Sequence, residues 1–364
     1  MSSNAINKPT EFVNLYDLAR AIPLIGPTLT LLIEGEPGTA KSSLLKIMEE
    51  VHGDKYHYVY FDCPVMDPSD LGLRVPNRET GRLEYYPTAL VPLDGKPVII
   101  MLDELAKAVK MMKTMFTRLM LERVLGDIKL PEGSIVFATS NNASDGVGDS
   151  MESHSINRLM RVKLKKVTSD EWCVWASQSG VHPIIRAWAD RNPKAFQSYR
   201  EITQKELEEN TYGIFDPRKP GQSFLSPRSL AKCDPIVRNK SVLGMDVVRT
   251  TLSGTIGHQS AESLAMFISI GDEVTRTADV IADPMGTPIP TKIAALIMMM
   301  FYAVDDIKTQ DDLTKFMQFV GRVPSREVSA VFYTMMCKVP KNIRLVRGNA
   351  TLTDWAAKNY ILLS

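Results

Sequence analysis

A run of small residues around one lysine is the segment of this sequence best suited to bind phosphate. The run and the residue after it are Gly35, Glu36, Pro37, Gly38, Thr39, Ala40, Lys41, Ser42 and Ser43. It follows the spacing GxxxxGK(S/T) except at Ala40, where the pattern has glycine. Small residues let successive backbone N–H groups surround a phosphate chain, and a following helix N-terminus adds positive charge. We predict that these residues bind a nucleotide, with Lys41 on the outer phosphates and Ser42 as a ligand of Mg²⁺. The alternative is a Gly-Pro turn before a capped helix.

Two adjacent carboxylates follow an apolar stretch further along the chain. The segment VIIMLDE ends in Asp103 and Glu104. Ligands of α/β proteins bind at the carboxyl ends of the strands, so an apolar strand would deliver both carboxylates to such a site. We predict that Asp103 holds Mg²⁺ through water and that Glu104 polarises the attacking water. The alternative is a solvated turn at the end of a strand.

Polar residues after a later apolar stretch extend this pattern. FATSNN places Asn141 where its amide could orient the same water against the γ-phosphate, although asparagine at a strand end also caps turns. The segment NRLMR then carries Arg158 and Arg161. Both arginines could be solvated, which is the usual state of this residue type.

The elements that would position these residues alternate in type along the first half of the chain. Short apolar runs predict five buried strands, and helical patterns separate several of them, as in a parallel sheet covered on both faces. Two further segments, 73–86 and 123–130, have apolar or β-prone arms around a turn and predict hairpins. The five predicted strands are 28–35, 57–63, 97–104, 134–141 and 161–167.

The second half of the sequence has a different character. Thr168 and Glu171 form a capping-box pattern that predicts a helix start, and helical stretches broken by prolines follow. We predict an α/β core over residues 1–167, a helical lid over 168–242 and a helical C-terminal region over 243–364.

Composition limits the classes of protein to consider. The chain has 43 Lys and Arg against 42 Asp and Glu, a net charge of +1, which argues against a protein that mainly coats nucleic acid. The longest uncharged apolar run, 293–304, is shorter than the ~20 residues of a membrane span, and the N-terminus lacks an apolar signal core. Four widely spaced cysteines and five histidines form no zinc-ligand pattern. We expect a cytoplasmic protein with reduced thiols and no membrane segment.

The order of these segments resembles the AAA+ ATPases, and among them the MoxR-like group with an insert in the second helix. The resemblance covers about residues 23–230 and rests on GEPGTAKS, VIIMLDE, FATSNN, INRLMR and SPR. Alanine often replaces the last loop glycine in that group, which accounts for Ala40. The tail also looks like that of some phage-encoded relatives. The resemblance implies a P-loop NTPase core of three αβα layers with a five-stranded parallel sheet, followed by the helical lid.

The resemblance also implies roles for individual residues. Asn141 matches the first sensor, and Arg228 matches the second sensor in the lid. Arg158 matches the arginine finger that reaches the nucleotide of a neighbouring subunit, with Arg161 as its rival. Asn157 and Leu159 replace the aspartate and phenylalanine that usually flank this finger.

These features together predict an ATPase that hydrolyses ATP with Mg²⁺ and remodels or activates a protein partner. The family implies a homo-oligomer, most often a hexameric ring, and a client that could carry a von Willebrand factor A domain. If the chain is phage-encoded, its compartment is the host cytoplasm. The alternatives are a nucleic-acid translocase or helicase-like motor, favoured by Arg74, Arg78 and Arg82 on the first hairpin, and a nucleotide-gated scaffold with little turnover.

Overall fold

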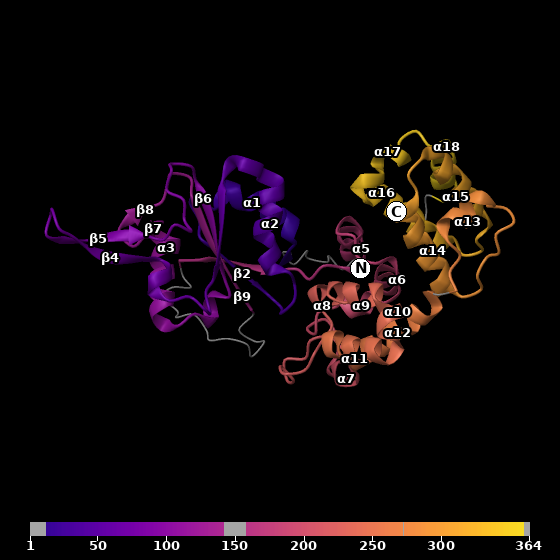
Figure 1. The fold of residues 1–364 in the computed structure, drawn as a ribbon, viewed down its shortest axis with the longest axis horizontal. Coiled ribbons are helices and arrows are strands. Elements are labelled where there is room, and N and C mark those ends of the chain that lie inside the picture. The colour runs from indigo at the N-terminus through magenta and orange to yellow at the C-terminus, as the bar shows by residue number, and fades with distance from the viewer. Residues whose placement is uncertain (1–11, 142–157, 272, 360–364) are drawn as a thin grey trace, which may run out of the picture. The chain divides into compact units, whose positions relative to one another are not determined.

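The computed structural model describes residues 12–141, 158–271 and 273–359. The chain forms two compact units, drawn mainly in indigo to magenta and in rose to yellow in Figure 1. The first unit contains residues 1–166 together with Pro217–Pro220, and the second contains Val167–Asp216 and Gly221–Ser364. We describe each unit by itself.

A parallel sheet forms the centre of the first unit. Its order is β1-β10-β2-β9-β6-β3, and every neighbouring pair is parallel. The five predicted strands are all present, and the two-residue β1 adds a sixth at one edge. The strands are β1 (Phe12–Val13), β2 (Leu31–Gly35), β3 (His57–Asp62), β6 (Val98–Asp103), β9 (Ile135–Asn141) and β10 (Met160–Leu164).

Helices cover both faces of this sheet, as the near-continuous apolar strands require. Alternate residues of β2, such as Leu31 and Ile33, pack with α1 and α2 in one buried core. Leu32, between them, belongs to a second core with α3 on the opposite face. The predicted three-layer αβα core is therefore confirmed (Figure 1). The helices of this unit are α1 (Leu15–Ile25), α2 (Leu44–His52) and α3 (Lys110–Glu122), with 3-10 turns η1 (Lys41–Ser43), η2 (Gly53–Lys55), η3 (Pro68–Asp70) and η4 (Leu105–Lys107).

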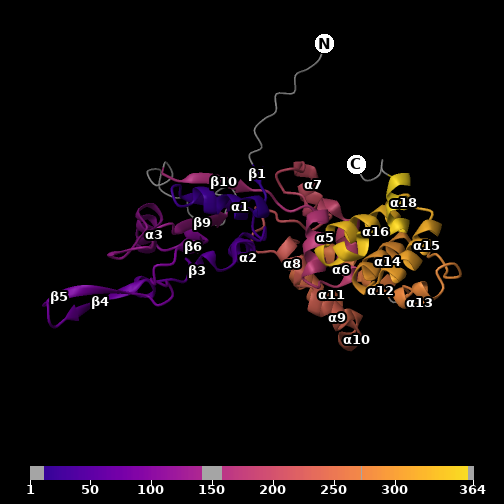
Figure 2. The same cartoon turned by 90° about the horizontal axis from the view of Figure 1, so that it is seen from above.

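Both predicted hairpins are present. The first consists of β4 (Gly72–Asn77) and β5 (Arg82–Pro87), and the second of β7 (Val124–Leu125) and β8 (Ile128–Lys129). In Figures 1 and 2 the β4–β5 hairpin extends outward beyond α3 and the end of β3.

Contacts near the turn of the second hairpin join the two hairpins. Arg74 forms a 2.7 Å ion pair with Asp127. The ring of Tyr85 lies where a Cβ on Gly126 would be, because that atom would come within 2.3 Å of the ring. The Tyr85 hydroxyl group donates a 2.7 Å hydrogen bond to the carbonyl oxygen of Leu71, so the ring cannot move aside without losing this bond.

We expect Gly126→Ala to lower the free energy of unfolding by about 2–4 kcal/mol, from a backbone cost at φ +59° and from overpacking against Tyr85. Gly81→Ala is the matched control, since Gly81 has φ +65° but nothing within 4 Å of an added Cβ. It should cost only the backbone contribution, about 1–2 kcal/mol. Urea unfolding of both variants measures the difference, and equal losses would show that the contact with Tyr85 does not stabilise the protein.

Among the described residues of the second unit, the regular elements are all helices, joined by loops, with an isolated bridge between Ile214 and Leu225. One core runs from Trp172 to Leu352 and includes the apolar residues of α14. Its longer helices are α5 (Ser169–Gln178), α6 (Pro183–Arg191), α11 (Met245–Ile256), α12 (His258–Gly271), α14 (Ile293–Asp306), α15 (Gln310–Arg322), α16 (Arg326–Lys338) and α18 (Ala350–Lys358). Its shorter ones are η6 (Pro193–Phe196), α7 (Gln204–Glu209), α8 (Pro227–Ala231), α9 (Asp234–Arg238), α10 (Lys240–Leu243), α13 (Thr277–Ala282), η7 (Pro340–Asn342) and α17 (Ile343–Val346).

Local sequence signals account for the start of this unit. The capping box predicted at Thr168 is present, with the side chains of Thr168 and Glu171 each bonded to the other's backbone N–H. Residues predicted as a lid (168–242) and as a C-terminal region (243–364) share one core, and a division between them stays a prediction. Within the described residues, no helix combines the length and the apolar character needed to cross a bilayer.

Candidate functional site

The carboxyl ends of three neighbouring strands bring the predicted site residues of the first unit together. β9 lies between β2 and β6, and its register places Asn141 beside Gly35. Asp103 ends β6 on the other side of β9. Residues separated by the two-residue period of these strands share a face, so Asp103, Thr139 and Asn141 all point toward the side of the sheet that α2 covers. The sheet order therefore assembles the site that three separate motifs predicted.

The loop after β2 has the backbone that a phosphate-binding loop requires. Gly38 and Ala40 both have left-handed backbone conformations, with φ of 78° and 64°. Ala40 therefore adopts the conformation for which the usual glycine is suited, at a cost of about 1–2 kcal/mol. A Cβ on Gly35 would lie 3.1 Å from the Thr39 hydroxyl oxygen and 3.3 Å from the Cβ of Leu164, which explains the need for glycine at the start of the loop.

Lys41 is held inside this loop. Lys41 is only 6% exposed. Its Nζ donates hydrogen bonds to the carbonyl oxygens of Gly35 at 2.8 Å and Glu36 at 2.9 Å. A third bond, of 2.9 Å, goes to Oδ1 of Asn141. The structure thus connects the predicted lysine directly to the predicted first sensor.

Asp103 connects the loop to the central strands. Ser42 Oγ donates a 2.7 Å hydrogen bond to Asp103 Oδ2, and the Thr139 hydroxyl group donates to Oδ1. Asp103 is 5% exposed. The two residues predicted to hold Mg²⁺ are therefore in direct contact. Thr139 was missed by the sequence motifs, although its position two residues before Asn141 on the same face of β9 is a usable signal.

Glu104 follows Asp103 in a left-handed backbone conformation, with φ of 53°. Such conformations are uncommon outside glycine and concentrate at functional sites. Its backbone N–H donates to the Thr139 hydroxyl oxygen at 3.3 Å, and its carboxylate forms a 2.5 Å ion pair with Lys107. The side chain is about one third exposed, so water can reach it.

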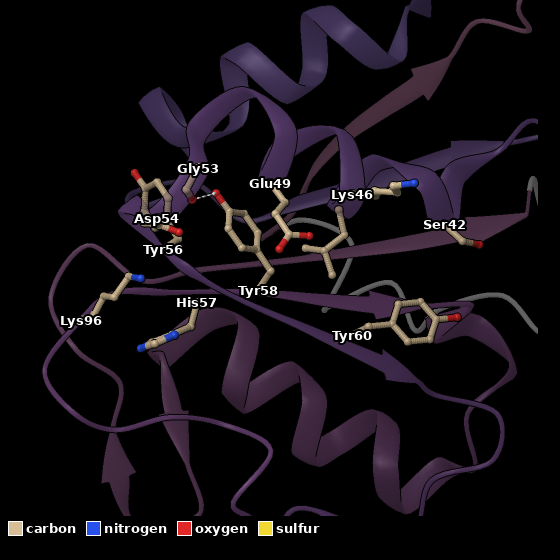
Figure 3. A pocket seen from close by; sticks show the side chains of 11 residues that line it. Ser42, Lys46, Glu49, Gly53, Asp54, Tyr56, His57, Tyr58, Tyr60 and Lys96 are labelled. Carbon is tan, nitrogen blue, oxygen red and sulfur yellow. Dashed lines mark hydrogen bonds between the residues drawn. The ribbon is translucent and has the colours of Figure 1, made fainter. Parts of the chain in front are cut away.

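A pocket of about 480 Å³ lies beside this site, between α2 and β3. Figure 3 shows Ser42 and Tyr60 at one end and His57 and Lys96 at the other. The Tyr60 hydroxyl group donates a 2.9 Å hydrogen bond to Asp103 Oδ2. Burial, and then this bond to a negatively charged carboxylate, raise the pKa of Tyr60 above its usual value. No motif in the sequence indicated Tyr60.

The two candidate finger arginines have different surroundings. Arg158 is exposed. The segment before it, 142–157, which includes Asn142 and Asn157, lies outside the described residues. Arg161, on β10, donates to both carboxylate oxygens of Glu34 on the neighbouring β2, at 2.8–3.2 Å. The Glu34 side chain is only 10% exposed. Arg161 is thus held within its own sheet.

Arg228 belongs to the second unit, in the first turn of α8. Ser226 caps this helix, and Pro227 occupies its first position. The Trp172 indole N–H donates a 3.1 Å hydrogen bond to the carbonyl oxygen of Pro227, which fixes α8 against α5. The role of Arg228 as a second sensor stays a prediction.

Comparison with protein families agrees with this geometry. Residues 30–158, which run from the start of β2 to Arg158, match the model of the AAA domain (dynein-related subfamily). The similarity is to this segment and not to the whole chain. The fold of this segment is that of the P-loop AAA+ proteins, as the resemblance implied. The match supports ATPase chemistry in general, while the finer MoxR-like type and a phage origin are not part of it.

Solved structures with a partial similarity to the chain include two bacterial proteins. A RuvB variant from Thermotoga maritima is 14% identical, with 77% of this chain and 79% of that chain covered and a TM-score of 0.37. NtrX from Brucella abortus in complex with ADP is 13% identical, with 96% of this chain and 68% of that chain covered and a TM-score of 0.36. No curated protein sequence matches the chain. At these scores, the fold assignment rests on the sheet order and the family model.

The oxygen atoms at this site fit a magnesium ion. A hydroxyl oxygen from Ser42 and a carboxylate from Asp103 lie in contact, and Mg²⁺ prefers oxygen ligands and usually binds through one or two carboxylates plus substrate phosphates. Ser42 and Asp103 are therefore the residues that would hold it.

Proposed function

We propose that this protein hydrolyses ATP to ADP and phosphate and uses the energy to remodel or activate a protein partner. The observation that carries the proposal is the bonded group of Lys41, Ser42, Asp103 and Asn141 at one end of the sheet. Lys41 and Asp103 are nearly buried and Ser42 and Asn141 are partly buried, and polar side chains that converge on a loop of this backbone are expected at a phosphate site. The match to the AAA domain supports the same reaction.

Each residue has a distinct part in the proposed reaction. The backbone N–H groups of the loop bind the phosphate chain, and Lys41 neutralises its outer charge. Mg²⁺, held by Ser42 and Asp103, would supply further positive charge to the phosphates. Glu104 accepts a proton from the attacking water, whose oxygen bonds to the γ-phosphorus as the bond to the ADP oxygen breaks. Asn141 orients this water.

The mechanism places part of the reaction in a neighbouring subunit. We propose a homo-oligomeric ring in which Arg158 reaches the nucleotide of the next copy and Arg228 contacts the nucleotide of its own chain. Isolated subunits should then bind ATP but hydrolyse it slowly. We also propose that the ring has six subunits and that the protein is located in the cytoplasm.

The β4–β5 hairpin is the proposed contact for a protein client. Four apolar side chains on it are more than two fifths exposed, and the register places three of them, Leu73, Val75 and Tyr86, on one face, as is typical of a protein contact site. These residues are Leu73, Val75, Leu83 and Tyr86. A client with a von Willebrand factor A domain is the candidate that the resemblance implies.

The nucleic-acid motor is less well supported by this hairpin. One of its three arginines, Arg74, is paired with Asp127, and the net charge of the chain is near zero. DNA that stimulates ATP hydrolysis, with an effect that falls steeply as salt rises, would favour the motor instead. A phosphate-release assay that finds ATP binding without turnover would favour the nucleotide-gated scaffold.

Lys41→Ala tests the proposed phosphate site. We expect ATP affinity to fall by about 10- to 100-fold, because a lost hydrogen bond to a charged group is worth about 1.5–3 kcal/mol. Calorimetric titration with a non-hydrolysable ATP analogue and Mg²⁺ measures the change. Lys129→Ala, an exposed lysine on β8, is the control and should bind as the wild type does. Unchanged affinity in Lys41→Ala would contradict the assignment of the loop.

A further inference from the structure

Tyr60 is a residue of the site that neither the sequence motifs nor the family match indicates. It lies on β3, the last strand of the sheet in the described part of the chain, on the face that α2 covers. The residue is 46% exposed, yet its hydroxyl group reaches the nearly buried carboxylate of Asp103 at 2.9 Å. The side chain therefore flanks the carboxylate from the edge of the sheet (Figure 3).

The hydrogen bonds of Asp103 show what this contact does. An ionised carboxylate offers about four acceptor positions. Oδ2 accepts from Ser42 and from Tyr60, and Oδ1 accepts from Thr139. Three hydroxyl donors on three different elements thus fix the carboxylate in one orientation.

We infer that Tyr60 is a positioning residue for the magnesium site, holding the Asp103 carboxylate in the orientation in which it faces Ser42. This inference rests on the proposed function, because it assigns Asp103 and Ser42 to the metal. Groups that bond to a metal-holding residue orient it in advance, and their loss commonly reduces metal affinity about 10- to 100-fold. Without the Tyr60 hydroxyl group, Oδ2 would keep only the bond from Ser42, so the carboxylate would be held less firmly about its terminal torsion, which is broad for aspartate.

Tyr60→Phe removes only this hydroxyl group. In EDTA, we expect the affinity for a fluorescent ADP analogue to stay within about twofold of wild type, since the phosphate loop is unchanged. The Mg²⁺ concentration that gives half of the maximal increase in this affinity should rise about tenfold. Titration of Mg²⁺ against analogue fluorescence measures both quantities without ATP turnover.

Tyr58→Phe is the matched control. Tyr58 lies two residues earlier on the same face of β3, and its hydroxyl group donates to the carbonyl oxygen of Gly53 at 3.0 Å instead of to Asp103. Its Mg²⁺ midpoint should equal that of the wild type. A Tyr60→Phe midpoint equal to or below that of wild type would overturn the inference, and a lower one would show that Tyr60 competes with the metal. Wild-type protein that takes up no analogue would instead overturn the proposed function itself.

Discussion

Replacing Glu104 by glutamine should reduce ATP turnover by about 10²–10⁴-fold, the usual contribution of a general base. The amide retains the size of the side chain but cannot accept the proton of the attacking water. ATP affinity should stay within about twofold, because Lys41 and Ser42, which bind the phosphates and the metal, are unchanged. Steady-state phosphate release and equilibrium binding of ATP measure the two effects separately.

The control for this variant is Glu122→Gln, which changes an exposed glutamate on α3 that is paired with Arg118. It should hydrolyse ATP as the wild type does. Turnover that is also normal in Glu104→Gln would remove Glu104 from its role as base. Loss of ATP binding in Glu104→Gln would show that the residue supports the loop instead of the reaction.

The ion pair between Glu104 and Lys107 bears on the same reaction. The ammonium group of Lys107 lies 2.5 Å from Oε2 of Glu104, one oxygen of the carboxylate that we propose as the proton acceptor. A carboxylate has about four acceptor positions, so Glu104 can accept a proton while Lys107 stays paired with it. The left-handed backbone of Glu104 is held on both sides, by its N–H bond to the Thr139 hydroxyl oxygen and by a 2.9 Å bond from the Lys107 N–H to its carbonyl oxygen.

The sequence predicted the central elements of the fold because their signals are local. Continuous apolar runs identified all five long strands of the sheet, and turn residues identified both hairpins. The two-residue β1 carries too little pattern to be recognised, and only its pairing with β10 defines it as a strand. The capping box at Thr168 is also a local signal, and it marks the start of α5 in the second unit.

The sequence motifs could not predict which residues of different strands would be in contact. The motifs predicted Lys41, Asp103 and Asn141 as separate features, and the sheet order, which no local pattern encodes, joins them. Thr139 and Tyr60 bond to Asp103 from two different strands, so neither contact has a fixed spacing in the sequence. Strand alternation alone could have placed both on the face of the site.

The sequence also could not predict that Arg161 pairs with Glu34. This pair distinguishes the two candidates for the arginine finger. Arg161 would have to leave both carboxylate oxygens of a side chain that is 10% exposed in order to reach another subunit. That would leave Glu34 buried without its charge partner, which is costly. Arg158 is exposed, and no ion pair with another described residue would have to open for it to reach a neighbouring subunit.

Arg158→Ala should therefore lower turnover by about 10³–10⁵-fold in the assembled protein, the range for an arginine supplied by a neighbouring subunit, without weakening ATP binding. Arg161→Ala should instead lower the free energy of unfolding, because Glu34 loses its partner, and should reduce turnover far less. Phosphate release, ATP binding and urea unfolding of both variants distinguish these outcomes.

Mixing the two inactive variants tests whether the finger acts between subunits. Arg158→Ala keeps a working Glu104, and Glu104→Gln keeps a working Arg158, so a mixed ring contains some sites with both groups intact. Turnover of the mixture should exceed that of either variant alone. If the mixture stays inactive, Arg158 does not act across subunits. If Arg158→Ala keeps full turnover while Arg161→Ala abolishes it, the finger is Arg161, and its bond to Glu34 must then open in the ring.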